Sequence, residues 1–139
     1  MALYLDTEYN CFHGQLISLA IASTEGDHWY RALPLPADVD PWVKHYVVPH
    51  INIEPTEPSA FKASLWAYLR QHASEPIFAD WPEDFAHLMQ WLCKPHGVAL
   101  TIELTMHLIQ SDTLYSKIPH NALADAIALM EWHQQLVEA

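Results

Sequence analysis

Residues 2–8 read ALYLDTE, a segment with the pattern of a β-strand that ends in two carboxylates. Side chains two positions apart on a strand point to the same face, so Asp6 and Glu8 are expected to lie side by side. Leu3 and Leu5 use the opposite face or precede them. Adjacent like charges repel, and a bridging cation removes the repulsion. For an isolated pair of this kind a solvated strand end is the simpler interpretation, so the rest of the chain has to decide.

Two more apolar segments of strand length follow. They are residues 16–23 (LISLAIAS) and residues 28–35 (HWYRALPL). Asn10 and Gly14 indicate a turn in the first connection, and Glu-Gly-Asp at residues 25–27 indicates one in the second. Because both connections are short, the three strands are expected to form an antiparallel meander.

The second half of the chain alternates between helical and strand-like patterns. Helices are predicted at residues 41–48 (stopped by Pro49), at residues 60–72 (with Ser59 as N-cap), from Pro82, and from Asn121 onward. Strands are predicted at residues 76–79 and 98–104, and residues 106–109 are predicted to be core. The order predicts an α/β fold, a mixed five-stranded sheet with three antiparallel strands and then parallel ones, flanked by helices.

Composition and length indicate a single domain over residues 1–139. The hydrophobic fraction of 51% and six tryptophans favour a packed globule. No apolar run approaches the roughly 20 residues of a membrane-spanning helix. No charged or apolar leader precedes Asp6, so no signal peptide is expected. Cys11 and Cys93 are too few for a disulfide framework and form no Cys-x-x-Cys pair, which predicts a reduced, cytoplasmic protein.

The charge balance restricts the kinds of nucleic-acid binding that are open to this chain. Six Lys and Arg face 17 Asp and Glu, for a formal net charge of −11, and the six basic residues are scattered. A basic stripe is the usual mark of a duplex-binding protein. Its absence from the sequence still permits an enzyme that holds a few nucleotides through bound metal ions, which cancel negative charge locally.

A second chemical motif lies near the C-terminal end, in the segment PHNALADA at residues 119–126. His120 precedes the predicted helix on solvent-reachable backbone, as a general base requires. Asp125 lies one turn inside the helix, a rigid position suited to a metal ligand. Helix capping explains Asn121 and Asp125 equally well, but it leaves His120 unexplained.

These motifs together resemble a known enzyme family. The Asp6-x-Glu8 pair, a mid-chain aspartate and the His120-x4-Asp125 pattern are similar to those of the DEDDh 3′→5′ exonucleases of the ribonuclease-H-like superfamily. A closer similarity is to the compact RNase AS-like exoribonucleases. Their first strand also ends in Asp-Thr-Glu and an aromatic residue, here Tyr9, and they carry a W-V-x-x-x-V-x-P segment, here residues 42–49 (WVKHYVVP).

The resemblance implies a ribonuclease-H-like fold and two Mg²⁺ or Mn²⁺ ions held by four carboxylates. Asp6 would bridge both ions, Glu8 and Asp125 would complete one site, and Asp84 would serve the other. His120 would be the general base. The expected product is a nucleoside 5′-monophosphate released from a single-stranded 3′ end, with RNA preferred, and a homodimer is a possible assembly.

The middle motif leaves an alternative open. The family pattern is an asparagine followed by the aspartate four positions later, and residues 78–85 read FADWPEDF. Asp84 fits as the metal ligand if Asp80 replaces the usual asparagine. We prefer Asp84, with Asp80 as a competing or additional ligand.

Aromatic side chains near these motifs are candidates for stacking on the bases of the substrate. Tyr9 and Phe12 follow the first carboxylates, and Trp81 lies beside the middle motif. Core packing explains Phe12 and Trp81 at least as well.

Three other functions remain open at this stage. The same chemistry could act on DNA, because the sequence has no identifiable reader of the 2′-hydroxyl. A ribonuclease-H-like domain without activity could serve as a binding module, although all five catalytic positions are filled. An acidic partner-binding protein with chance motif matches is the third.

Overall fold

The central strand of the sheet carries the first two candidate carboxylates. The computed structural model describes residues 1–94, 97, 99–111 and 114–138, and within them β1 (Leu3–Tyr9) is the middle of five strands in the order β3-β2-β1-β4-β5. β2 (Leu16–Ser23) pairs antiparallel with β1 and with β3 (His28–Ala32). β4 (Ile77–Ala79) runs parallel to β1, and β5 (Met106–Leu108) runs parallel to β4. The predicted architecture is confirmed.

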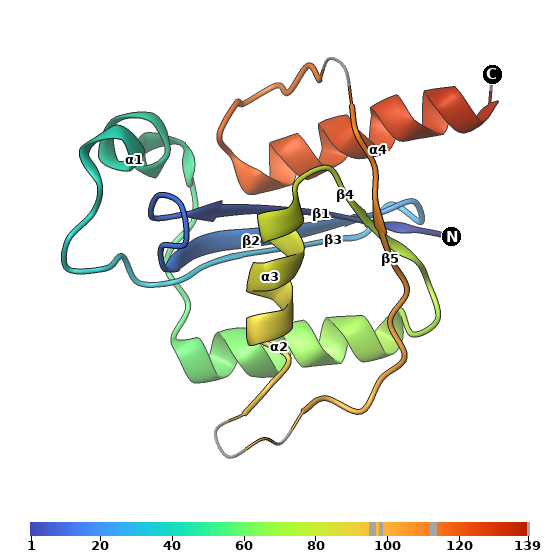
Figure 1. The fold of residues 1–139 in the computed structure, drawn as a ribbon, viewed down its shortest axis with the longest axis horizontal. Helices are drawn as coiled ribbons and strands as arrows, with labels where there is room; N and C mark the ends of the chain where they lie inside the picture. Colours follow the sequence, from blue (N-terminus) through green and yellow to red (C-terminus); the bar gives the residue numbers. More distant parts are fainter. Residues whose placement is uncertain (95–96, 98, 112–113, 139) are drawn as a thin grey trace.

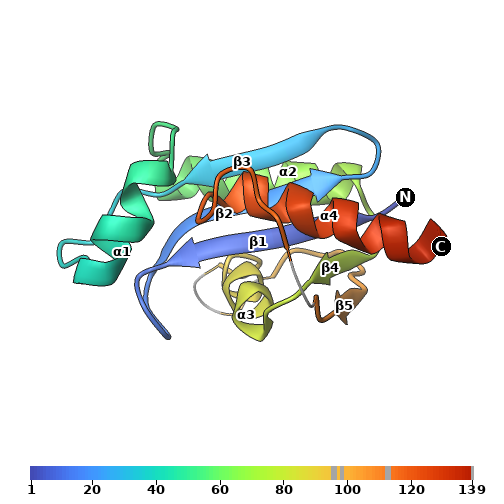
Figure 2. The same ribbon diagram turned by 90° about the horizontal axis from the view of Figure 1, so that it is seen from above.

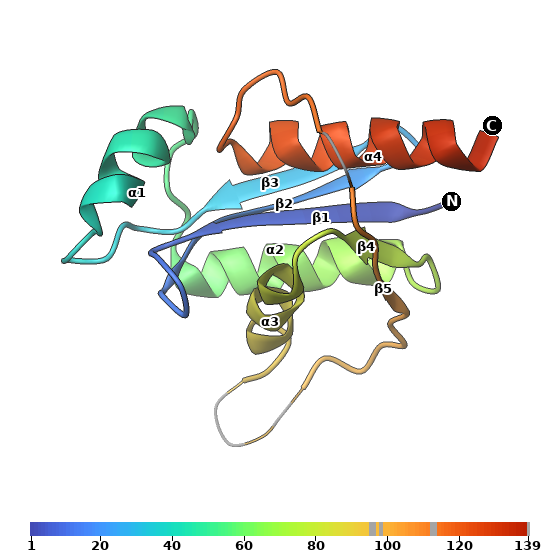
Figure 3. The same ribbon diagram turned by 45° about the horizontal axis from the view of Figure 1, so that its top comes forward.

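Helices cover both faces of this sheet (Figures 1 and 3). α4 (Ala122–Glu138) packs on one face, and α2 (Pro58–Gln71) and α3 (Pro82–Gln90) pack on the other. The alternation along β1 explains both layers, because Leu3 and Leu5 belong to the core under α2 and α3 while Tyr4 belongs to the core under α4. Asp6 and Glu8 continue the face that carries Tyr4.

A small helical segment lies at the end of the sheet where β1 ends and α4 begins (Figures 1 and 3). It consists of α1 (Pro41–Tyr46) and the 3-10 turn η1 (Val48–His50). Val43 and Val47 anchor it against Ile17 of β2. The predicted helix over residues 41–48 was two residues too long, because α1 ends at Tyr46. Pro49 lies inside the separate 3-10 turn, where its missing N–H costs no helical hydrogen bond.

Other predicted boundaries also need correction. β3 ends at Ala32 rather than at residue 35, and α2 begins at Pro58 with Glu57 as N-cap, so Ser59 lies inside the helix. Proline at the first helical position provides a φ angle that suits the start of a helix.

The last predicted strand was misplaced. The described residues 99–104 form no strand beyond the isolated bridge of Ala99 with Cys93, and Val98 lies outside the described part. Ile102 and Leu104 instead pack against the core. The strand is β5, whose Met106 and Leu108 are 37% and 51% exposed because β5 is an edge strand (Figure 2). The expectation that residues 106–109 are core was therefore wrong for Met106–Leu108, whereas Ile109 packs against the core under α4.

Candidate metal and catalytic site

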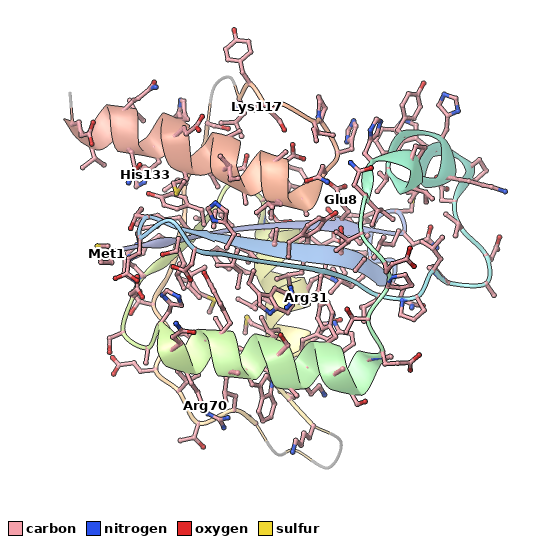
Figure 4. The ribbon with its side chains drawn as sticks, turned by 180° about the vertical axis from the view of Figure 1, so that it is seen from behind. Met1, Glu8, Arg31, Arg70, Lys117 and His133 are labelled. Carbon is pink, nitrogen blue, oxygen red and sulfur yellow. The ribbon has the colours of Figure 1, made fainter. Side chains whose placement is uncertain are left out.

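One group of carboxylates forms where β1 meets the first turn of α4. Asp6, Glu8 and Asp125 each direct one carboxylate oxygen into the group, and these oxygens lie within 4.8 Å of one another. Strand alternation places Asp6 and Glu8 on the face that α4 covers. Figure 4 shows Glu8 beside the start of α4, at the end of the sheet opposite Met1 and His133. This spacing is compatible with three oxygen ligands of one cation.

A second group shares Asp6 with the first. It consists of Asp6, Asp80 and Asp84, whose ligand oxygens also lie within 4.8 Å of one another. Asp80 follows β4, and Asp84 lies in the first turn of α3. Both candidates from the middle motif therefore reach Asp6. Asp6 is the carboxylate in position to bridge two cations.

Asp84 is the more firmly held of the two middle aspartates. Its side chain is 2% exposed, and its Oδ1 accepts a hydrogen bond of 2.6 Å from the Thr7 hydroxyl. Its Oδ2 is buried and has no hydrogen-bond partner. Asp80 is half-buried and accepts a longer bond of 3.4 Å from Ser111. Thr7 was not predicted as a site residue, because its side chain points away from the Asp6 and Glu8 face.

The electrostatics of the two groups favour protons or cations over free carboxylates. Burial, followed by repulsion from neighbouring carboxylates, raises the pKa of Asp6 well above its usual range. Burial and the charges of Asp125 and Asp84 raise the pKa of Glu8 to about 9. Burial raises the pKa of Asp84 to about 7 although its bond to Thr7 lowers it, and burial also raises the pKa of Asp125.

The orphaned oxygens give an independent test of whether cations fit this site. Asp6 Oδ2 and Asp84 Oδ2 are buried without a hydrogen-bond partner. A buried carboxylate oxygen that lacks a partner is costly, and a bound cation would remove that cost. Both groups offer oxygen donors only, which suits hard cations such as Mg²⁺ or Mn²⁺.

His120 lies at the mouth of the site on strained backbone. It is half-buried, has a φ of +66°, and contacts Trp42 edge-on with ring centroids 5.3 Å apart. Burial raises the pKa of the Asp125 carboxyl, and the nearby His120 ring acts in the opposite direction. A residue held in the left-handed region needs support from its surroundings.

Asn121 supplies that support. Its Oδ1 accepts from the Ala124 backbone N–H at 2.9 Å, and its Nδ2 donates to the His50 carbonyl at 2.7 Å. The predicted N-cap is therefore confirmed, and the same side chain ties the start of α4 to η1. Asn121 therefore helps to hold in place both His120, which precedes α4, and Asp125, which lies in the first turn of α4.

A cavity of about 650 Å³ opens over the carboxylates. Its lining includes the predicted residues Asp6, Glu8, Asp84 and His120. The three aromatic candidates for base stacking also line it: Tyr9, Phe12 and Trp81. Phe12 is 71% exposed and Trp81 is 54% exposed, so core packing does not explain either side chain.

Trp42 was missed as a lining residue, although residues 42–49 had been recognised as a motif. It is 52% exposed and faces the same cavity. Asp40 accepts from the Trp42 backbone N–H at 3.0 Å, and Asn10 bonds to the backbone of Asp38 and Asp40 at 2.9 and 2.8 Å. The polar residue after β1 therefore positions α1, a relationship that only the tertiary structure reveals.

The loop after β1 is held against α3. Tyr9 stacks on the buried His87 with ring centroids 4.6 Å apart, and the His13 backbone N–H donates to Glu83 at 3.0 Å. Cys11 and His13 both have a positive φ, of 67° and 61°. Glu83 and His87 thus hold the loop that carries Tyr9 and Phe12, but neither residue belongs to the two carboxylate groups that contain Asp6.

The surroundings of the cavity agree with the acidic composition. No lysine or arginine occurs among the described residues that line it.

Cys11 and Cys93 are both exposed free thiols. No helix in the described part of the chain is long and apolar enough to cross a membrane.

Comparison with known proteins adds no family to these observations. No protein-family model matches this sequence, and a search of curated proteins finds no match either.

Proposed function

We propose that this chain is a metal-dependent 3′→5′ exonuclease of the DEDDh type that shortens single-stranded RNA. The observation that carries the proposal is the position of Asp6, which belongs to both carboxylate groups beneath one cavity. Asp6, Glu8 and Asp125 would hold one divalent cation, and Asp6 with Asp84 would hold the other, with Asp80 beside them. When bound, Mg²⁺ or Mn²⁺ activates the attacking water and stabilises the leaving 3′ oxygen.

Residues of the chain are assigned the proton transfer and the positioning of the general base. His120 accepts a proton from the attacking water on a ring nitrogen as the new oxygen–phosphorus bond forms. The bond between phosphorus and the 3′ oxygen of the preceding nucleotide then breaks, which releases a nucleoside 5′-monophosphate. Asn121 keeps His120 at the cavity mouth through its bonds to η1 and α4.

Substrate binding follows from the aromatic lining and the lack of cationic side chains. Trp42, Phe12 and Trp81 offer exposed rings on which terminal bases can stack. The described lining residues include no lysine or arginine, so the bound cations would have to supply the positive charge that binds the phosphate. Such a site favours a few nucleotides of a single strand over a long duplex.

The finer parts of the proposal rest on the similarity of motifs. The restriction to 3′ ends comes from the DEDDh pattern, and the preference for RNA comes from the RNase AS-like Asp-Thr-Glu-Tyr and residues 42–49. A cytoplasmic location and assembly as a homodimer belong to the same proposal.

The decisive experiment uses RNA and DNA oligonucleotides of one sequence, each labelled at its 5′ end, with Mg²⁺ or Mn²⁺. The expected result is a ladder that shortens from the 3′ end of RNA, with nucleoside 5′-monophosphate as product. Chelator and Asp6→Asn should both abolish it. Faster degradation of DNA would change the substrate class, and activity that persists in chelator would overturn the mechanism. Metal binding without degradation of either strand would identify a binding module.

A further inference from the structure

A second cluster of ligand-type side chains lies at the opposite end of β1. Glu25 and Asp27 occupy the turn between β2 and β3, and His72 is the C-cap of α2. The backbone bond from Thr24 N–H to the Ala2 carbonyl, at 3.0 Å, places this turn beside the start of β1. The cluster is therefore separate from the Asp6 groups, which lie where β1 ends.

The geometry of the cluster centres on a buried imidazole. His72 is 3% exposed, its Nε2 lies 2.8 Å from Asp27 Oδ2, and its Nδ1 lies 2.5 Å from Glu75 Oε2. Glu25 Oε2 lies 3.8 Å from Nδ1. One ligand atom each from Glu25, Asp27 and His72 can be chosen so that all lie within 4.8 Å of one another.

The charges in this cluster do not balance. Three carboxylates face one imidazole, which supplies a single positive charge even when both ring nitrogens are protonated. In the described part of the chain, no lysine or arginine forms an ion pair with Glu25, Asp27 or Glu75. A divalent cation would compensate the excess negative charge.

Tyr68 gives a separate indication of a missing partner. Its side chain is 8% exposed, and its ring lies 4.5 Å from that of His72. The hydroxyl is buried beside Asp27, Glu75 and Glu25, and its hydrogen-bonding interaction with Asp27 does not reach ordinary hydrogen-bond geometry. Glu75 Oε1 is likewise buried without a partner. Polar atoms left in this state point to a group that completes the site.

We propose that Glu25, Asp27 and His72 bind a divalent transition-metal ion such as Zn²⁺. In this arrangement Nε2 of His72 is a ligand beside Asp27, and its Nδ1–H donates to Glu75. A carboxylate that holds the far nitrogen in this way is the usual partner of a metal-binding histidine. The partly exposed Glu25 side chain, whose Oε2 lies 3.8 Å from Nδ1, has to turn toward the Nε2 side to complete the ligand set. Three protein ligands of mixed nitrogen and oxygen type suit Zn²⁺, whereas the oxygen-only Asp6 groups suit Mg²⁺ or Mn²⁺. The side chains of Glu25 and Asp27 are 46% and 45% exposed, which gives the ion access.

The test measures Zn²⁺ binding by calorimetry in an Asp6→Asn/Asp125→Asn background, which removes Asp6 from both carboxylate groups and Asp125 from the first. One equivalent of Zn²⁺ per chain is expected. Adding Asp27→Asn or Glu25→Gln should weaken binding at least about tenfold. Glu54→Gln, an exposed carboxylate outside the cluster, is the matched control and should have no effect.

Asp27→Asn and Glu25→Gln are preferred to His72→Gln as tests. The side chains of Asp27 and Glu25 are partly exposed, so changing them leaves the core intact, whereas His72 is buried. Circular dichroism checks that each variant is folded. No Zn²⁺ binding in the background variant would overturn the proposal, and so would binding that survives both Asp27→Asn and Glu25→Gln.

Nitrogen-15 NMR of the His72 ring distinguishes the metal site from a buried imidazolium. Saturating Zn²⁺ should leave one proton on the ring, at Nδ1, whereas an imidazolium that stays protonated at both nitrogens would refute the site. Asp27→Asn in the otherwise unchanged chain should retain Mg²⁺-dependent exonuclease activity. This outcome separates the Zn²⁺ site from the proposed catalytic one.

Discussion

The Thr7 hydroxyl donates a hydrogen bond of 2.6 Å to Oδ1 of Asp84, and the bond joins β1 to α3 across 77 residues of sequence. Asp6 and Glu8 flank Thr7 and point to the opposite face of the strand. One strand therefore presents two carboxylates toward α4 and also fixes a third that belongs to α3.

Replacing this hydroxyl should loosen the site. Thr7→Val keeps the shape of the side chain but leaves the buried Asp84 oxygen without its donor, so the free energy of unfolding should fall by about 1–3 kcal/mol. Chemical denaturation measures the change. Thr7→Ser retains the donor and should lose only about 0.8 kcal/mol for its missing methyl group. Equal losses in both variants would show that the hydrogen bond contributes nothing.

The two middle aspartates should respond differently to neutralisation. Asp84 is buried and held by Thr7, so Asp84→Asn should abolish Mg²⁺-dependent exonuclease activity at any Mg²⁺ concentration. Asp80 is half-buried and makes only a long hydrogen bond to Ser111. Asp80→Asn should therefore raise the Mg²⁺ concentration needed for half-maximal activity by about 10- to 100-fold, and its activity should recover at high Mg²⁺. Rates measured across a Mg²⁺ titration make the comparison. The reverse ranking would make Asp80 the principal ligand.

Removing the imidazole of His120 should slow the chemical step without affecting cation binding. Asparagine tolerates the left-handed backbone at this position, so His120→Asn avoids adding strain. The single-turnover rate should fall by about 10²- to 10⁴-fold. Mg²⁺ should still raise the Tm of His120→Asn, as we expect it to do for the unmodified chain, because the carboxylates that would hold the ion are unchanged. His45→Ala, an exposed histidine on α1, is the control and should keep full activity. A rate unchanged in His120→Asn would exclude the residue as the base.

The stability of the metal-free protein should fall as pH rises. The folded pKa values are about 7 for Asp84 and about 9 for Glu8, against ordinary values of 3.8 and 4.5. Between the unfolded and the folded pKa values the folded state binds more protons than the unfolded state. The stability that these two groups contribute is therefore fully present below about pH 4 and declines as the pH rises from there to about 9.

Chemical denaturation in chelator at a series of pH values tests this dependence. Because Asp6 lies in both carboxylate groups, Asp6→Asn should make the decline shallower. Mg²⁺ should reduce the decline in the unmodified chain, since deprotonated carboxylates bind the ion more tightly. A chelated protein that gains stability toward pH 9 would contradict the assigned electrostatics.

Trp42 should contribute to substrate affinity through stacking. Trp42→Ala should weaken binding of a short single-stranded oligonucleotide by about 1–3 kcal/mol, which is about 5- to 150-fold in Kd. Trp42→Phe retains an aromatic face and should lose less. Fluorescence anisotropy in Ca²⁺, expected to support binding without turnover, provides the measurement. Equal affinity of the Ala variant and the unmodified chain would exclude stacking at this position.

Local sequence was sufficient for features that depend on neighbouring residues. The alternation in residues 2–8 placed Asp6 and Glu8 on one face, and Asn121 was correctly identified as the cap of α4. The predicted strand at residues 16–23 matches β2 in full. Patterns of this kind follow from strand and helix geometry within a few residues.

Prediction failed where the environment of a segment decides its structure. The apolar residues 99–104 have strand character, but Ile102 and Leu104 pack on the core while the less apolar β5 forms the parallel edge. Trp42 is an apolar residue type that is usually found in a core, but α1 presents it to the cavity. The bonds of Asn10 to the backbone of Asp38 and Asp40 help to hold α1 in that position.

Short-range patterns in the chain were enough to predict the order of strands and helices, the face on which Asp6 and Glu8 lie, and the capped helix that carries Asp125. They could not predict that Asp80 and Asp84 both reach Asp6, that Thr7 holds Asp84, or that Glu25, Asp27 and His72 meet at the other end of the sheet. The physical reason is the range of the interactions. Backbone geometry and capping act within a few residues, whereas these contacts depend on parallel strand pairing and helix packing between distant segments.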